Sequence, residues 1–174
     1  MSKALFIDAD IVLDLLCKRE PFYPYAAEVF TMGDKGILSL VTTPLVFANV
    51  FYILRKSLGI ERAKELLRKL RIIIGIVETN EKIVDVALNS NFSDFEDGIQ
   101  YFAAREQGIR ILLTRNIKDF KGADMIVQTP EEFLKSRNWQ KDPREVFETS
   151  LTEFTDDFMA DGRNQSPVQE REGL

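Results

Sequence analysis

Two spacings of apolar residues run through positions 1–136, one typical of buried strands and the other of helices. Short apolar runs predict strands at residues 4–8, 37–43, 72–78, 109–114 and 124–128. Apolar residues three and four apart predict helices at residues 11–20, 24–34, 45–56, 61–71, 79–90, 93–108 and 129–136. Because strands and helices alternate, we expect an α/β fold with a parallel sheet covered by helices on both faces.

Several helix ends carry residues that cap helices. Thr43 before a proline predicts an N-cap and first turn, and Gly59 predicts the end of that helix. Ser93 and Glu96 have the spacing of a capping box, which would account for Glu96 without a catalytic role. Asp10 is predicted to cap the helix after the first strand.

The helix at residues 93–108 has an apolar face that we expect to pack on the core. That face holds Phe95, Ile99, Phe102 and Ala103. Asp94 and Asp97 then project together from another face, where two like charges are unfavourable unless a cation or a basic group answers them. Asp94 has a second interpretation, as a first-turn acid favoured by the helix dipole.

Other polar residues stand where apolar runs stop. Asp8 ends the first strand, at the edge of a parallel sheet where ligand sites form. Thr114 and Asn116 end a later strand, and Asp119 follows in the next turn, where it is either a site residue or an ordinary loop acid. Asn49 lies inside an otherwise apolar helix, so it faces either a core partner or the polar pocket.

Composition limits the chemistry. The chain has no histidine, which removes the commonest general base and transition-metal ligand, and its one cysteine, Cys17, excludes an internal disulfide. Carboxylates suit hard cations such as Mg²⁺ or Mn²⁺. We find no charged-then-apolar leader and no apolar run of about 20 residues, so a cytoplasmic protein without a membrane segment is expected.

Charge divides the 174 residues into two parts. Residues 1–136 hold 18 Lys and Arg against 19 Asp and Glu, whereas residues 137–174 hold 5 against 9. The apolar periodicity also fails after Ser136, so we predict a domain at residues 1–136 and an acidic tail at residues 137–174. Residues 55–71 hold seven basic and two acidic residues, which indicates either a phosphate-binding stretch or a solvated helix face.

Four segments, FIDADIVLDLL, TPLVFANVFYILRK, DFEDGIQYFAA and LLTRNIKDF, resemble in their order and spacing the PIN domain, the nuclease fold of VapC-type toxins. The resemblance covers roughly residues 3–136. It implies a three-layer α/β/α sandwich with a parallel sheet of about five strands. It also implies an acidic pocket at the strand ends that binds Mg²⁺ or Mn²⁺.

The resemblance assigns the site residue by residue. Asp8 matches the first metal-binding Asp of the family, and Asp97 matches the Asp of its third motif, with Asp94 as an additional acid. In the fourth motif Asn116 stands where many members have Asp, and Asp119 follows it. Asn49 occupies the position at which the second motif usually has Glu. An amide contributes no charge, so these departures predict weaker binding of a divalent cation.

The function implied is metal-dependent hydrolysis of RNA by the toxin of a type II toxin–antitoxin system, with an antitoxin partner and a homodimeric state. The metal would lower the pKa of a bound water and balance charge in the transition state. Thr114 would orient water or phosphate, and Arg115 would contact a phosphate oxygen. The residues predicted to follow the RNA backbone are Arg55, Lys56, Arg62 and Lys69.

The tail has a weaker resemblance to the toxin-binding arm of some antitoxins. In that case Phe154 and Phe158 would be anchors, and Arg163 or Arg171 would enter the acidic pocket. Its composition equally fits a disordered extension. For the whole chain, the alternative to a nuclease is a PIN-fold module that binds RNA or protein and has lost turnover. A phosphotransfer receiver-like domain is disfavoured, since no strand end supplies its phosphoacceptor Asp or its Lys.

Overall fold

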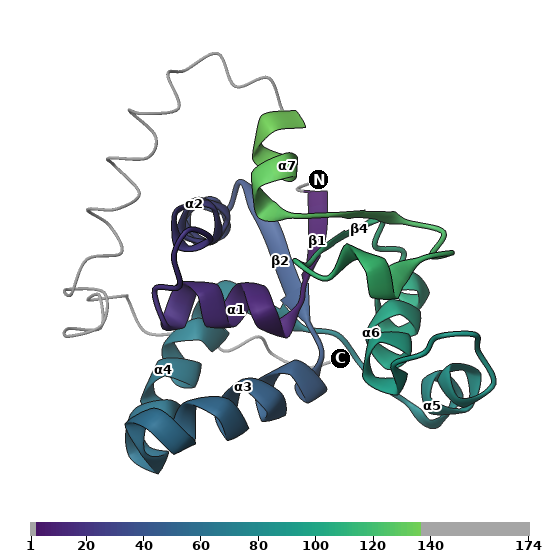
Figure 1. The fold of residues 1–174 in the computed structure, drawn as a ribbon, viewed down its shortest axis with the longest axis horizontal. Coiled ribbons are helices and arrows are strands. Elements are labelled where there is room, and N and C mark those ends of the chain that lie inside the picture. The colour runs from purple at the N-terminus through teal and green to yellow at the C-terminus, as the bar shows by residue number, and fades with distance from the viewer. Residues whose placement is uncertain (1–2, 137–174) are drawn as a thin grey trace, which may run out of the picture.

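The computed structural model describes residues 3–136, and the predicted tail anchors and arginines lie outside these described residues (Figure 1). The strands are β1 Lys3–Ile7, β2 Leu38–Thr42, β3 Ile74–Ile76, β4 Ile111–Leu113 and β5 Ile126–Gln128. The helices are α1 Ala9–Leu16, α2 Tyr23–Asp34, α3 Pro44–Leu58, α4 Ile60–Ile73, α5 Glu81–Leu88, α6 Phe95–Glu106 and α7 Pro130–Ser136. A short 3₁₀ helix, η1, spans Ile117–Phe120.

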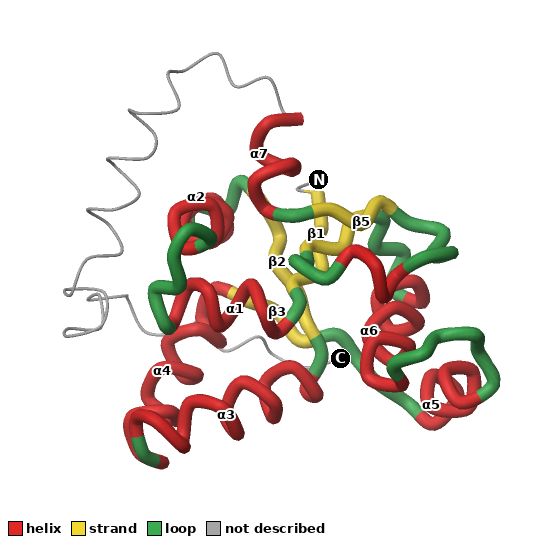
Figure 2. Tube along the Cα trace, viewed as in Figure 1, coloured by secondary structure: helices red, strands yellow, loops and turns green. Residues whose placement is uncertain are grey.

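The five strands form one parallel sheet in the order β3-β2-β1-β4-β5, so β1 is central (Figure 2). Leu5 of β1 is in register with Leu40 of β2, and Phe6 with Leu112 of β4. The predicted parallel sheet is therefore confirmed. The strand predicted at residues 72–78 is shorter than expected, because α4 continues through Ile73.

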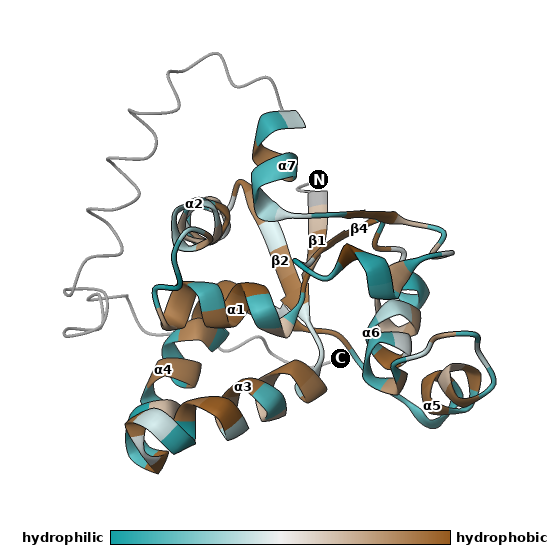
Figure 3. Ribbon diagram, viewed as in Figure 1, coloured by the Kyte–Doolittle hydropathy of each residue, from teal (hydrophilic) through white to brown (hydrophobic). Residues whose placement is uncertain are grey.

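The two faces of the sheet carry separate apolar cores, which confirms the three-layer α/β/α sandwich. Leu5 and Ile7 point into the core under α1, α2, α3, α4 and α7, whereas Phe6 points into the core under α5 and α6. Figure 3 shows mostly apolar residues along the strands and a mixture of apolar and polar residues along the helices. This alternation follows from the two-residue period of a strand.

The helix ends at α3 confirm the capping prediction. The Thr43 hydroxyl accepts a hydrogen bond from the backbone N–H of Val46 at 3.4 Å. Gly59 then joins α3 to α4 with φ +80°, a left-handed conformation that glycine adopts at little cost. These two ends fix the length of α3, the helix that supplies one wall of the pocket described below.

The other capping predictions are wrong. Asp94, not Ser93, is the N-cap of α6, and Asp8, not Asp10, is the N-cap of α1. The cap lies one residue later than predicted in α6 and two residues earlier in α1, so a different side chain meets the free N–H groups. The core assignment of Phe95 is also wrong, because this first residue of α6 is 45% exposed.

No helix within residues 3–136 is both long and apolar enough to cross a membrane.

Packing of α3 on the sheet can be tested with two leucines of the same helix. Leu54 is fully buried, whereas Leu58 is 45% exposed. We expect Leu54→Ala to lower the free energy of unfolding by about 2–5 kcal/mol, because it removes buried apolar contacts and leaves a cavity. Leu58→Ala is the matched control, with an expected change of about 0.5 kcal/mol or less. Urea unfolding measures both, and equal effects would contradict the described packing.

Candidate functional site

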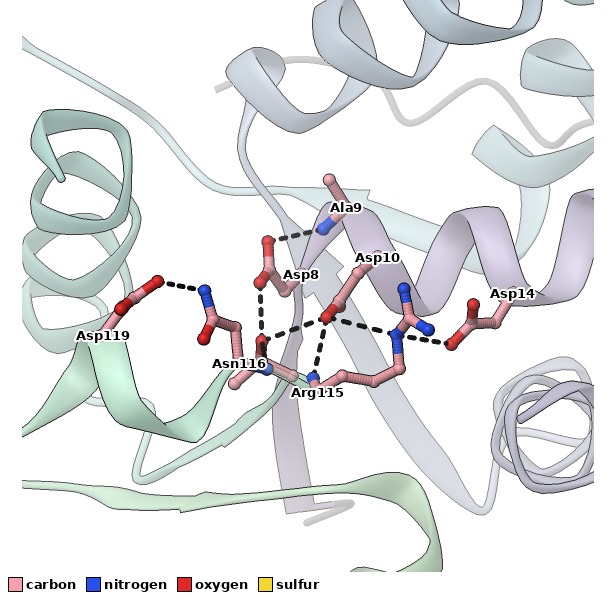
Figure 4. A network of polar contacts seen from close by, with 8 residues as sticks. Asp8, Ala9, Asp10, Asp14, Arg115, Asn116 and Asp119 are labelled. Carbon is pink, nitrogen blue, oxygen red and sulfur yellow. Dashed lines mark hydrogen bonds and ion pairs between the residues drawn. The ribbon is translucent and has the colours of Figure 1, made fainter. Parts of the chain in front are cut away.

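The central feature of the site is the pair formed by Asp8 at the end of β1 and Thr114 at the end of β4. The Thr114 hydroxyl donates to Asp8 Oδ2 at 2.8 Å, and the backbone N–H of Ala9 donates to Asp8 Oδ1 at 2.6 Å (Figure 4). Both side chains are buried. Adjacent parallel strands bring them together, as predicted for residues at the carboxyl ends of strands.

Asp10 is a site residue that sequence reasoning missed. Its Oδ2 accepts a hydrogen bond from the backbone N–H of Arg115 at 2.8 Å and lies 3.4 Å from the Thr114 hydroxyl. Its Oδ1 is buried and has no hydrogen-bond partner among the described residues. The sequence did contain an indication, since Asp10 follows Asp8 by two residues. The sequence analysis assigned Asp10 as an N-cap and therefore gave it no role in the site.

Arg115 faces carboxylates of α1, whereas the sequence analysis placed it on a phosphate. Its Nε lies 3.2 Å from Asp14 Oδ2 and 3.6 Å from Asp10 Oδ2 (Figure 4). Its guanidinium also lies over the ring of Phe22, at 4.4 Å from the ring centroid. Asp14 is fully buried within α1. Arg115 therefore joins the β4 end to α1 and supplies positive charge next to Asp10 and Asp14.

At the start of α6 the cap is Asp94 and Glu96 lines the pocket, whereas the sequence analysis gave the capping box to Ser93 and Glu96. Asp94 is exposed and caps the helix, accepting from the backbone N–H groups of Glu96 at 2.8 Å and Asp97 at 3.3 Å. Glu96 was predicted to belong to a capping box. It instead accepts a hydrogen bond from the side-chain amide of Asn49 on α3. Asn49 thus faces the polar pocket, one of its two predicted alternatives.

Asn116 and Asp119 form a second amide–carboxylate pair. The Asn116 side-chain amide donates to Asp119 Oδ2, and its backbone N–H donates to the Thr114 hydroxyl at 3.0 Å. Asp119 lies on η1, and its charge also acts on Asp97 of α6. The segment after β4 therefore connects the Asp8 side of the site with the α6 side.

An open pocket of about 420 Å³ lies at this edge of the sheet. It is lined by Asp8, Ala9, Asp10, Leu13, Asn49, Tyr52, Ile53, Glu96 and Asn116. Three of the predicted site residues, Asp8, Asn49 and Asn116, are in its wall. Glu96 and Asp10 add carboxylates that were not predicted there, and Tyr52 with Ile53 adds an apolar rim.

Burial and mutual repulsion perturb the acids of the site. Burial, followed by the charge of Asp10, raises the pKa of Asp8 to about 7. Burial, followed by the charges of neighbouring acids, of which Asp94 contributes most, raises the pKa of Asp97 to about 7. Burial also raises the pKa of Asp14 to about 6, against the opposing effect of Arg115. The site therefore holds more negative charge than its surroundings stabilise.

A divalent cation suits this set of donors chemically. Carboxylate and amide oxygens are the ligands of Mg²⁺ and Mn²⁺, and a cation would relieve the repulsion at Asp8 and Asp97. The buried Asp10 Oδ1 is an acceptor in need of a partner. Within residues 3–136 no three acidic or Cys side chains converge closely enough to form a finished metal cage. The residues thus fit a cation that keeps several of its waters.

The four predicted RNA-backbone residues fall into two groups. Arg55 and Lys56 are exposed on α3, and both lie over the ring of Tyr52. Arg62 and Lys69 lie on α4 and pair with Glu65, at 2.7 Å and 3.4 Å. The first pair is next to the pocket through Tyr52, whereas the second pair is engaged along its own helix.

Comparisons with known proteins agree with this geometry. Residues 4–118 match the PIN domain family. Over 141 residues the chain is 28% identical to "Ribonuclease VapC1" of Aquifex aeolicus (strain VF5), covering 79% of this chain and 97% of that protein. A chain in the crystal structure of VapBC2 from Rickettsia felis bound to a promoter DNA fragment superposes with a TM-score of 0.56 at 17% identity, covering 72% and 98% of the two chains. That last likeness is one of fold.

The raised pKa of Asp8 makes stability depend on pH. Between pH 3.8 and about 7 the folded protein holds a proton on Asp8 that the unfolded chain releases, so stability falls as pH rises through this window. Asp8→Asn removes a buried charge that costs up to about 4 kcal/mol. We therefore compare the free energy of unfolding of Asp8→Asn with that of the wild type. From pH 5 to pH 8 this difference should increase by roughly 2–4 kcal/mol in favour of the variant.

Urea unfolding at the two pH values measures this difference, with the exposed Asp85→Asn on α5 as control. The free energy of unfolding of the control should differ from that of the wild type by nearly the same small amount at both pH values. An Asp8→Asn difference that does not change with pH would contradict a buried, protonated Asp8.

Proposed function

This chain belongs to the PIN domain family, and from that membership we propose that it is a ribonuclease that uses Mg²⁺ or Mn²⁺ to hydrolyse RNA phosphodiester bonds. The observation that carries the proposal is Asp8, a buried carboxylate at the end of the central strand, open to a pocket with further acids. Several carboxylates at one edge of the sheet, with more negative charge than the nearby basic groups neutralise, suit metal-assisted hydrolysis without histidine.

The similarity to a VapC ribonuclease supports RNA as the substrate. Together with the likeness to a chain of a VapBC complex, it supports a role as the toxin of a toxin–antitoxin pair held in check by an antitoxin. A cytoplasmic location and a homodimer are part of the same proposal.

Asp8 and Asp97 are the residues proposed to hold the cation, joined by Asp10 and with Asp94 nearby as the helix cap. When bound, the cation would lower the pKa of a water and balance charge on the reacting phosphate. Thr114 fixes the Asp8 carboxylate through its hydroxyl. Arg115 acts as a positioning residue, because its backbone N–H and its Nε both face Asp10.

The amides of the site have supporting roles in this proposal. Asn49 holds Glu96 in the pocket wall, and Asn116 holds Asp119. A carboxylate therefore accompanies each amide, so the lack of charge on Asn49 and Asn116 does not empty the site of acids. Arg55 and Lys56 would contact phosphates of the RNA, with Arg62 and Lys69 farther along α4.

A second candidate function is a PIN-fold module that binds RNA or protein without turnover. It is favoured by Asn49 and Asn116, which stand where the family resemblance expects acids. Metal-dependent cleavage separates the two candidates.

RNA cleavage tests the first candidate directly. We expect the full chain, and more strongly the chain ending at Ser136, to cut a mixed pool of labelled RNAs with Mn²⁺ and not with EDTA. Asp8→Asn and Asp97→Asn should each lower the rate at least about a hundredfold, because each removes charge that the cation requires. Asp85→Asn, on the outside of α5, is the control and should cut as wild type does.

Two results would count against parts of this scheme. No cleavage of any RNA by either chain would favour the binding module. Equal cleavage by the two chain lengths would reject residues 137–174, with Phe154, Phe158, Arg163 and Arg171, as an inhibitory arm.

Metal binding can be measured without activity. At pH 8 we expect Mn²⁺ to raise the melting temperature of the wild type, because a cation relieves repulsion between deprotonated Asp8, Asp10 and Asp97. Mn²⁺ should raise the melting temperature of Asp97→Asn much less, and it should raise that of Asp85→Asn as much as that of the wild type. An identical shift for Asp97→Asn would place the bound cation elsewhere.

A further inference from the structure

Asp14 is a buried acid without a role in the function proposed above. It is fully buried on α1, where its neighbours Leu13 and Leu15 belong to an apolar core. Neither of its carboxylate oxygens has a hydrogen-bond partner among residues 3–136. An apolar side chain of similar size would pack in such a place at least as well as a charged one. An acid at a core position is a local conflict of the kind found at functional sites.

The charge that answers Asp14 is Arg115, and Asp14 shares it with the pocket residue Asp10. Arg115 Nε lies 3.2 Å from Asp14 Oδ2 and 3.6 Å from Asp10 Oδ2, between the two carboxylates (Figure 4). Asp10 and Asp14 are four residues apart on α1, so they lie on one face, about 6 Å apart along the helix axis. One cation therefore serves two acids.

Packing holds the Arg115 side chain beside α1. Its guanidinium lies 4.4 Å from the ring centroid of Phe22. The backbone N–H of Phe22 donates to the carbonyl of Arg19 at 3.0 Å, and the backbone N–H of Arg19 donates to the carbonyl of Asp14 at 3.0 Å. The segment after α1 thus bonds back to Asp14 and places Phe22 on Arg115.

The acids and the cation on this side of the site leave a surplus of negative charge. Two carboxylates, Asp10 and Asp14, face one guanidinium, so the three groups have a net charge of −1. Without Asp14 the same cation would balance Asp10 alone, and the net charge would be zero. Asp10 lines the pocket, and within the described part of the chain its buried Oδ1 has no hydrogen-bond partner. The surplus charge therefore lies next to an oxygen that suits a cation.

We propose that Asp14 is a positioning residue for a divalent cation in the pocket, because it draws Arg115 away from Asp10 and keeps the α1 side of the pocket negative. The inference rests on the proposed function and deepens it, since Asp14 is not among the residues that line the pocket. It also explains how Arg115 lies beside the site without cancelling the charge of Asp10.

The affinity of the full chain for Mn²⁺ tests this role without RNA. Isothermal titration calorimetry at pH 8 measures it, a pH at which Asp14 is ionised, since burial raises its pKa to about 6. We expect Asp14→Asn to weaken Mn²⁺ binding about tenfold, because it keeps the size of the side chain and removes the surplus charge. Asp85→Asn, which removes an exposed acid of α5, is the control and should bind Mn²⁺ as wild type does.

A double variant separates this role from simple support of the fold. Asp14→Asn with Arg115→Gln removes one acid and one cation, so the net charge on the α1 side returns to −1. We expect the double variant to bind Mn²⁺ within about threefold of wild type. If the ion pair only supported the fold, the double variant would bind Mn²⁺ no better than Asp14→Asn. Urea unfolding in EDTA checks that each variant is folded.

Two results would overturn the inference. One is an Mn²⁺ affinity of Asp14→Asn within about twofold of wild type, and the other is a double variant that binds about tenfold more weakly than wild type. The second criterion decides alone if the single variant does not fold.

Failure of the nuclease proposal is a separate outcome. If Mn²⁺ binds to the variants as expected but no RNA is cut, the role of Asp14 stands and the nuclease proposal fails alone. If RNA is cut but Asp14→Asn binds Mn²⁺ as wild type does, the role of Asp14 fails alone. If the wild type binds no Mn²⁺, the inference fails together with the metal dependence of the proposed function.

Discussion

The site depends on one constraint, the burial of the Asp8 carboxylate at the end of the central strand. Because β1 has strands on both sides and helices on both faces, Asp8, which directly follows it, is largely shielded from water. A carboxylate in that position is unfavourable, and burial together with Asp10 raises its pKa to about 7. The Thr114 hydroxyl and the Ala9 N–H oppose this effect by hydrogen bonding. The raised pKa of Asp8 is therefore the outcome of burial and repulsion opposed by two hydrogen bonds.

The surrounding elements distribute charge around that carboxylate. Arg115 lies between Asp10 and Asp14 on the α1 side and is the cation that the acids of α1 share. On the opposite side, Asp97 receives repulsion from its neighbours and has a pKa raised to about 7, with burial as the largest cause. The two ends of the site differ for this reason: Arg115 partly neutralises the acids of α1, whereas acidic neighbours add repulsion at Asp97.

Amides replace acids at two positions without removing carboxylates from the pocket. Asn49 and Asn116 each donate to a carboxylate, Glu96 in one case and Asp119 in the other. In a site with surplus negative charge, a neutral donor stabilises an acid that a second acid would repel. Asn49 and Asn116, which suggested a weakened site in the sequence, are therefore compatible with an acidic pocket. The carboxylates beside them lie on α6 and η1.

The sequence by itself determined the fold, because two-residue and helical periods identify buried strands and amphipathic helices locally. It also placed Asp8 and Thr114 at the carboxyl ends of parallel strands, which meet at one edge of the sheet. Tertiary structure decided the roles of acids that are neighbours in sequence. In α6 the cap lies one residue later than predicted, which made Asp94 the cap and turned Glu96 toward Asn49. In α1 the cap lies two residues earlier than predicted, which made Asp8 the cap and freed Asp10 for Arg115. Capping patterns fix a helix start only to within a residue or two, whereas each residue turns a side chain by about 100° around the helix. Which carboxylate faces the pocket is therefore settled only when the helix packs against the sheet.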